Sequence, residues 1–341
     1  MNDKPYIQAR AMDWRAALAA NQRKTILVMC SFVLIYLAIG FFIDLYIYGA
    51  FSQNNFMSVF HALIALKIFP MITFASGVVA LIAIGITFAL HDRIMLLGTT
   101  YHPVTESGAS DLAEQQLYNL VEELKIAAGL RYMPKIYIIE ADYLNAFASG
   151  YSEKSAMIAV TRGLMQKLTR EELQAVMAHE LSHIRHGDIK LTLMVSVLSN
   201  LMLMMVDILF YNTLFSRRDR DENGWILIVI VLLRYVLPLI TILLMLYLSR
   251  TREYMADAGS VELMRDNQPL GKALLKIAND HDQNYEQYQR AYGKTTHENV
   301  RQAAYIFDPF DNDIHPIKST MSFFSTHPAI RDRLDAIGFD K

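Results

Sequence analysis

The chain has 341 residues, enough for a membrane region and one compact soluble domain. Hydrophobic residues make up 53% of it and charged residues 19%, against a usual charged share of about 25%, so the composition favours a protein partly dissolved in lipid. A net charge of −2 without a long basic run argues against a nucleic-acid partner, and the single cysteine, Cys30, excludes an intramolecular disulfide.

Four apolar runs are each long enough for a transmembrane helix, which needs about 20 residues. They are Thr25–Tyr48, Val59–Leu90, Ile189–Tyr211 and Trp225–Leu248. Because the second run contains Lys67 and Pro70, we expect it to cross the membrane only over Pro70–Leu90, after a short interfacial or re-entrant piece. The first run is too long for a signal-peptide core, so we expect a retained anchor.

The distribution of Lys and Arg predicts the orientation of these runs. Basic residues cluster before the first run and are absent after it in residues 49–58, which places the N-terminus in the cytoplasm by the positive-inside rule. After two crossings the block 91–188 lies on the same side. Three arginines in 212–224 oppose this orientation, whereas Arg250 and Arg252 support it. We therefore predict that both soluble blocks are cytoplasmic.

The soluble blocks carry ordinary globular signals. Leucines at helical spacing predict a helix over 111–129, and β-forming runs predict strands over 135–140, 145–150 and 155–161. After the fourth apolar run, residues 249–264 are expected to be helical. The polar stretch Asp280–Asn299 is expected to form a loop or a weakly ordered insertion.

The stretch TREELQAVMAHELSHIRHG, residues 169–187, has signals for both ends of a helix. Thr169 followed by Glu172 is a capping box, and Gly187 suits the C-terminal end. We therefore predict a helix over Arg170–His186 that carries the motif HELSH.

Two histidines four residues apart on this helix, His179 and His183, project from one face and can bind the same zinc ion at about 2.0–2.1 Å. Glu180 lies about 100° round the helix, so it can reach a water on that ion and act as general base for attack on a peptide carbonyl. A pattern this short also arises by chance, but its place in a capped helix beside a membrane run favours a site. His186 is near the same face, either as an outer-shell group or, more simply, as a solvated residue.

A catalytic zinc of this kind takes two histidines and a carboxylate and leaves one position for water. The best carboxylate is Glu253 in EYMAD, because the third apolar run leaves the cytoplasmic face after the motif and the fourth returns just before Glu253. Asp257, four residues on, can accept the free ring N–H of a ligating histidine. Without HELSH, both acids would be interpreted as part of a solvated helix face.

Four motifs in this order, NAFASG, HELSH, EYMAD and STHP, resemble the HtpX family of membrane zinc metalloproteases, which are related to the CAAX prenyl proteases. The resemblance runs from about residue 102 to the C-terminus. It implies one Zn²⁺ per chain on His179, His183 and Glu253, with Glu180 as the base and Asp257 behind a ligand. It implies that His327 and Arg333 lie near the active site, where either could stabilise the oxyanion. It also implies an edge strand that pairs with the substrate backbone, made of Asn145, Ala146, Phe147 and Ala148.

The expected fold class is α+β, in a mainly helical integral membrane protein with about four transmembrane helices. Its gluzincin-like zinc protease domain contains a small β-sheet. The expected parts, in chain order, are a cytoplasmic N-terminal segment (1–24), transmembrane helices 1 and 2 (25–90), the first part of the protease domain (91–188), a transmembrane hairpin (189–248) and the second part of the protease domain (249–341).

Three charged residues, Asp44, Asp207 and Arg234, lie within the apolar runs. A lone charge near the centre of a bilayer costs at least about 2.5 kcal/mol. We therefore predict an Arg234–Asp207 pair, with Asp44 as the alternative partner of Arg234.

The expected function is that of a zinc metalloendopeptidase, integral to the plasma membrane (the inner membrane in a bacterium), with a cytoplasmic catalytic domain. The resemblance implies quality control, with damaged or misassembled membrane proteins as substrates. Processing of prenylated peptides is the enzymatic alternative, although four helices cannot build the large chamber of the CAAX proteases. A zinc-stabilised membrane scaffold or holdase is the non-enzymatic alternative. The intact Glu180 argues against it, because a structural site needs no base.

Overall fold

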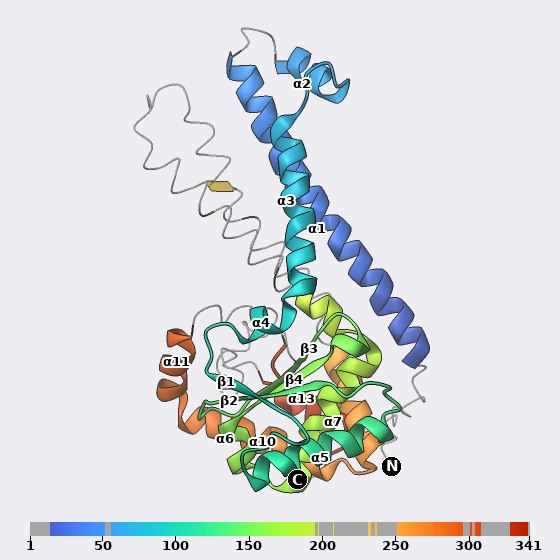
Figure 1. Ribbon diagram of the computed structural model, residues 1–341, viewed down its shortest axis with the longest axis vertical. Coiled ribbons are helices and arrows are strands. Elements are labelled where there is room, and N and C mark those ends of the chain that lie inside the picture. The colour runs from blue at the N-terminus through green and yellow to red at the C-terminus, as the bar shows by residue number, and fades with distance from the viewer. Residues whose placement is uncertain are drawn as a thin grey trace, which may run out of the picture.

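The computed structural model describes residues 14–51, 56–194, 251–295 and 328–339, and also positions 197, 207, 231, 232, 236, 301 and 304–307. In this part of the chain a long helical hairpin extends from one side of an α+β domain (Figure 1). Most of the third and fourth apolar runs, Arg234 of the predicted Arg234–Asp207 pair, and His327 lie outside the described residues.

The hairpin consists of α1 (Trp14–Phe51) and α3 (Met71–Ala89), with the short helix α2 (Phe56–Ile64) between them (Figure 1). Within the described residues, Arg23–Gly49 and Met71–Ala89 are the two stretches long and apolar enough to cross a membrane. Large apolar side chains on both helices are exposed, among them Leu34, Phe42 and Leu81. Such an apolar exterior suits contact with lipid.

A buried carboxylate joins the two helices of the hairpin. Asp44 of α1 accepts hydrogen bonds from the backbone N–H of Ile72 (3.0 Å) and from the backbone N–H and hydroxyl of Thr73 (both 2.8 Å). The first amides of a helix have no partner within the helix, so Asp44 satisfies two of them at the start of α3. These contacts differ from the pairing with Arg234 that was considered for Asp44.

The domain contains a four-stranded sheet in the order β1-β2-β4-β3. Strand β2 (Lys135–Ile139) is parallel to β4 (Met157–Thr161), and β3 (Ala146–Ser149) is antiparallel to β4, within the predicted limits for these three strands. Strand β1 (Tyr101–Val104) pairs antiparallel with β2 and was not predicted. It contains Pro103 and buries only its last residue, a pattern that fits an edge strand but hides the usual strand signal.

One face of the sheet packs against α5 (Leu112–Ala127) and α7 (Arg170–His186), the helix of the HELSH motif. Alternate residues of the strands, such as Ile138 and Val160, are fully buried there. Both helices have the limits expected from the sequence to within two residues. This packing fixes α7 against the sheet beside β3.

The opposite face of the sheet shares its apolar core with the hairpin. Phe147 of β3 and Met157 of β4 belong to one buried cluster with Val28 and Phe32 of α1. Leu191, from the segment that follows α7, belongs to it as well. The long helix α1 is therefore part of the core of the domain.

The expectation of a loop over Asp280–Asn299 is wrong for residues 280–294. Helix α10 (Gln268–Gln283) continues almost directly into α11 (Tyr285–Lys294). Tyr288 and Tyr292, one helical turn apart, are buried, and the remaining side chains are mainly polar. Helix α11 therefore packs against the domain through these two tyrosines, although most of its residues are hydrophilic.

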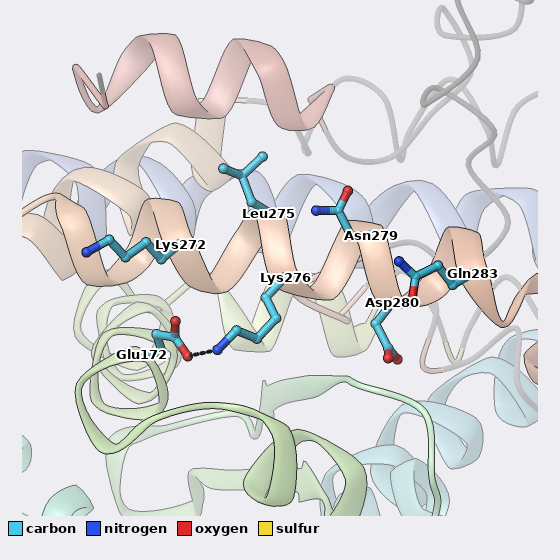
Figure 2. Close-up of a pocket in the computed structure, with 7 residues that line it drawn as sticks. All are labelled: Glu172, Lys272, Leu275, Lys276, Asn279, Asp280 and Gln283. Atoms are coloured by element: carbon cyan, nitrogen blue, oxygen red, sulfur yellow. Dashed lines mark hydrogen bonds and ion pairs between the residues drawn. The ribbon is translucent and has the colours of Figure 1, made fainter. Parts of the chain in front are cut away.

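Charged contacts fix α10 beside the start of α7. Figure 2 shows Lys276 of α10 directed at Glu172, and the Nζ–Oε2 distance is 2.6 Å. Asp280 pairs with Lys167 and accepts a hydrogen bond from the Tyr288 hydroxyl at 2.6 Å. The remaining short elements are α4 (His91–Leu96), the 3-10 turn η1 (Glu153–Ser155), α6 (Arg162–Lys167) and α13 (Ile330–Ala336).

Candidate metal centre

The helix that carries HELSH begins and ends at residues suited to those positions. Thr169 Oγ1 accepts from the Glu172 N–H at 3.3 Å, and the Glu172 carboxylate accepts from the Thr169 N–H at 2.8 Å, which confirms the predicted capping box. Gly187 ends the helix in the left-handed conformation with φ 69°. The helix is almost completely buried, and His179 and Glu180 have no exposed surface.

Residues 251–264 form a helix, as expected, and it lies very close to α7. A Cβ atom on Gly259 would lie 2.5 Å from Oγ of Ser182 in α7, so only glycine fits this contact. The neighbouring Ser260 hydroxyl donates to the Ala175 carbonyl of α7 at 2.7 Å. This close approach brings Glu253 and Asp257 to the face of α7 that carries the histidines.

Three atoms that can donate an electron pair to a metal converge between these helices. The Nε2 atoms of His179 and His183 are 3.1 Å apart, and each lies 3.6 Å from an oxygen of Glu253. Ligands about 2.0–2.1 Å from a tetrahedral zinc ion are separated by about 3.3–3.4 Å. The donor set therefore matches the size and chemistry of a zinc site.

Each histidine has a carboxylate behind it. Nδ1 of His179 lies 2.9 Å from Oδ1 of Asp257, and Nδ1 of His183 lies 3.0 Å from Oδ2 of Asp188. A carboxylate beside Nδ1 favours the ring proton on that nitrogen, which would leave the Nε2 lone pair to a bound metal. Asp188 was not identified from the sequence, although it directly follows the helix terminator and lies five residues after His183.

The electrostatic environment of these residues attracts positive charge. Burial alone would lower the pKa of His179, but Asp257 and Glu253 raise it to about 9. Burial is likewise outweighed at His183, whose pKa is raised by Asp188 and Glu253. The pKa of Asp257 is lowered in spite of its burial, because the Arg333 guanidinium stabilises its charged form.

Glu180 has the surroundings of a proton-transfer group. Burial raises the pKa of its carboxyl, and Glu253 adds to this, while the two histidines act in the opposite direction. Its two oxygens are buried, and neither makes a well-formed hydrogen bond within the described part of the chain. A buried carboxylate with a raised pKa beside a metal-sized donor set is a candidate for a proton-transfer group.

Arg333 of α13 is fully buried behind the donor set. Its Nε and Nη2 donate to the two oxygens of Asp257 at 2.8 and 2.6 Å, and its Nη1 donates to the Ile306 carbonyl at 2.7 Å. The guanidinium therefore supports Asp257, the carboxylate behind His179, and a role in stabilising the oxyanion stays a prediction. Its nearest approach to the donor set is 3.9 Å, from Nη1 to Oε2 of Glu253.

The expected substrate strand is partly covered by the chain itself. The Ala146 carbonyl accepts from the Ile306 N–H at 2.9 Å, and Phe147 forms an antiparallel bridge with Tyr305. Residues 304–307 therefore pair with the outer edge of β3 over its first two residues. The backbone of Ala148, the last of the four expected residues, lies beside Glu180.

Asn145 and His186 both have buried side chains. The Asn145 side chain has no exposed surface, and its Nδ2 donates to the Phe307 carbonyl at 3.0 Å and to the Tyr292 hydroxyl at 3.3 Å, so the side chain holds the fold, while pairing of its backbone with a substrate stays a prediction. His186 is also buried, against the Gly259 contact, and does not lie on a solvated face. Burial lowers its pKa.

Comparison with known proteins matches this chain to a peptidase family and to individual proteases. Residues 111–338 match the model of "Peptidase family M48". The chain is similar to a "Protease HtpX homolog" of Helicobacter pylori (strain Shi470), with 39% identity over 320 residues, 94% of this chain and 96% of that protein. It is also similar to a "Protease HtpX homolog" of Thermoanaerobacter pseudethanolicus, with 32% identity over 323 residues, 93% of this chain and 94% of that protein. Among solved structures, S. mikatae Ste24p aligns with 20% identity and a TM-score of 0.45, over 93% of this chain and 66% of that one.

Proposed function

Because this chain belongs to peptidase family M48, we propose that it is a membrane-bound zinc endopeptidase whose single Zn²⁺ is held by His179, His183 and Glu253. The observation that carries the proposal is the convergence of these three donors at 3.1–3.6 Å, with Glu180 on the same helix. Three protein donors, one fewer than a structural zinc site takes, are typical of a catalytic zinc, which would keep a position for water or substrate.

The proposed reaction is hydrolysis of a peptide bond. When bound, zinc would polarise the attacking water and the substrate carbonyl. Glu180 takes the proton from the attacking water and delivers it to the nitrogen of the leaving amine. Its raised pKa supports this double role, because the protonated form must persist long enough to act as the acid.

The substrate backbone is proposed to pair with the outer edge of β3 beside Ala148, close to Glu180. Residues 304–307 already occupy the edge at Ala146 and Phe147, so Ala148 is favoured over those two. His327, as the sequence suggested, is proposed to donate a hydrogen bond to the oxyanion that forms on the substrate carbonyl.

The substrates proposed are damaged or misassembled membrane proteins, cut on the cytoplasmic side of the bilayer. Two features support this choice. The hairpin of α1 and α3 has an apolar exterior, and its helix α1 packs into the core of the domain that carries the donor set. The metal-binding region is therefore attached directly to helices suited to lipid.

The decisive experiment compares Glu180→Gln with wild type and with the matched variant Glu171→Gln, an exposed glutamate on the same helix. Glu180→Gln is expected to keep one zinc per chain and to lose cleavage of a denatured protein substrate by roughly 100-fold or more. Glu171→Gln is expected to cleave at the wild-type rate. Cleavage by Glu180→Gln at the wild-type rate, with metal bound, would contradict the proposed mechanism.

A further inference from the structure

A second buried carboxylate beside the donor set is not explained by the reaction. Asp188 is 1% exposed and directly follows the glycine that ends α7. Its Oδ2 lies 3.0 Å from Nδ1 of His183, and its Oδ1 is buried without a hydrogen-bond partner in the described part of the chain. A buried acceptor costs stability when it is left unsatisfied, so a reason for this residue is needed.

Helix capping does not supply that reason. Asp188 begins the helical segment 189–194, where an aspartate side chain would ordinarily accept from the next free backbone N–H groups. Here Oδ2 faces His183 and Oδ1 has no donor, so among the described residues the carboxylate does not cap the segment that it begins. Its orientation serves the metal-binding histidine instead.

Asp188 is also connected to the third donor through its backbone. Its carbonyl accepts from the Thr192 N–H at 3.0 Å and from the Thr192 hydroxyl at 3.3 Å. The same hydroxyl accepts from Nη1 of Arg252, a buried residue that directly precedes Glu253. Three hydrogen-bonded steps thus lead from His183 to the residue next to Glu253.

We propose that Asp188 is a positioning residue for His183, and that Asp188, Thr192 and Arg252 together form a brace that fixes His183 relative to Glu253. This inference rests on the proposed zinc site. The carboxylate of Asp188 holds the proton of His183 on Nδ1 and fixes the angle of the ring, so that Nε2 faces Glu253. The Thr192–Arg252 contact holds the two helices at the distance that one ion requires.

The brace lies where the chain enters and leaves the stretch predicted to cross the membrane. It spans the two points at which the chain leaves for and returns from the sequence predicted to cross the membrane, residues 189–248. Of the proposed ligands, His183 precedes this stretch and Glu253 follows it. The brace therefore links in space two ligands that are far apart in the sequence.

The test measures zinc affinity in the full-length protein by competition with a chromophoric chelator. Asp188→Ala is expected to bind zinc about 10–100-fold more weakly than wild type. Asp188→Asn, which keeps the shape and an oxygen acceptor, is expected to lie between the two. Asp335→Asn changes an exposed aspartate of α13 in the same way and is expected to leave the affinity unchanged.

The outcomes separate this inference from the proposed function. A wild-type protein without stoichiometric zinc would overturn the function itself. A wild-type protein that binds zinc, with the same affinity in Asp188→Ala, would overturn only the positioning role. If Asp188→Ala does not fold, Asp188→Asn and Thr192→Val decide the question, because the first removes only the carboxylate charge and the second only the Thr192 hydroxyl. Wild-type zinc affinity in both of these would refute it.

Discussion

Asp257 and Arg333 form a fully buried ion pair with two hydrogen bonds, and Asp257 in turn contacts His179. The two residues are 76 positions apart in the chain. The C-terminal helix α13 is therefore connected to a proposed metal ligand through a single carboxylate. Changes in α13 should reach the metal site without any direct contact with the ion.

Arg333→Ala is expected to destabilise the folded protein by about 3–5 kcal/mol, because it leaves the buried, charged Asp257 carboxylate without its guanidinium partner. Thermal or denaturant unfolding in detergent measures the loss. Arg331→Ala, an exposed arginine of the same helix, is the matched control and should be close to wild type. Equal stability of the two variants would show that the ion pair is dispensable.

Glu253→Ala is expected to lose zinc, since two histidines alone provide too few protein ligands for a stable site. Metal analysis of the purified protein should give one zinc per chain in wild type and much less in the variant. Glu262→Ala removes an exposed carboxylate from the same helix and should keep its zinc. Full zinc content in Glu253→Ala would eliminate the proposed ligand set.

Gly259→Ala is expected to push the helix 251–264 away from α7, since the new Cβ would lie 2.5 Å from Oγ of Ser182. Overpacking of this kind costs about 1–3 kcal/mol, and zinc affinity should fall with it. Gly293→Ala, where a Cβ meets nothing within 4 Å, provides the control. Both unfolding temperature and chelator competition report the difference, and an unchanged Gly259→Ala would show that the helices can adjust.

Glu114 is expected to make stability depend on acid pH. Burial alone would raise the pKa of Glu114, but hydrogen bonds from Ser110 and Arg162 lower it from 4.5 to about 2. Since the folded-state pKa is below the unfolded one, its contribution is fully present above about pH 4.5 and is lost as the pH falls through about 2.

The comparison of wild type with Glu114→Gln measures this effect. The stability difference is expected to be roughly 3 kcal/mol at pH 7 and to shrink steadily below pH 4.5. Glu123→Gln, an exposed glutamate of the same helix, should show neither effect. A difference that stays constant between pH 7 and pH 3 would exclude the carboxylate charge as its cause.

Those parts of the structure that depend on neighbours in the chain were predictable. The limits of α7 follow from Thr169, Glu172 and Gly187, which act within one helical turn. The approach of Glu253 to HELSH was predictable for a different reason, because two expected membrane crossings would return the chain to its starting side.

Features that depend on contacts between distant residues were not predictable. Asn145 holds Phe307, and Ile306 pairs with the edge of β3, although nothing in the local sequence distinguishes a covered strand edge from an open one. Asp188 had a local signal, its position after Gly187, but that position suggests a helix cap. Only the direction of its side chain identifies its partner.

The length of α1 has a consequence for how the protein can be divided. A helix of 38 residues extends for about 57 Å, nearly twice the roughly 30 Å of a bilayer's hydrocarbon layer. Its buried residues Val28 and Phe32 form part of one wall of the domain. A fragment that starts after the hairpin would lack that wall and expose the apolar face behind Phe147. Removal of the hairpin is therefore expected to expose part of the core of the domain.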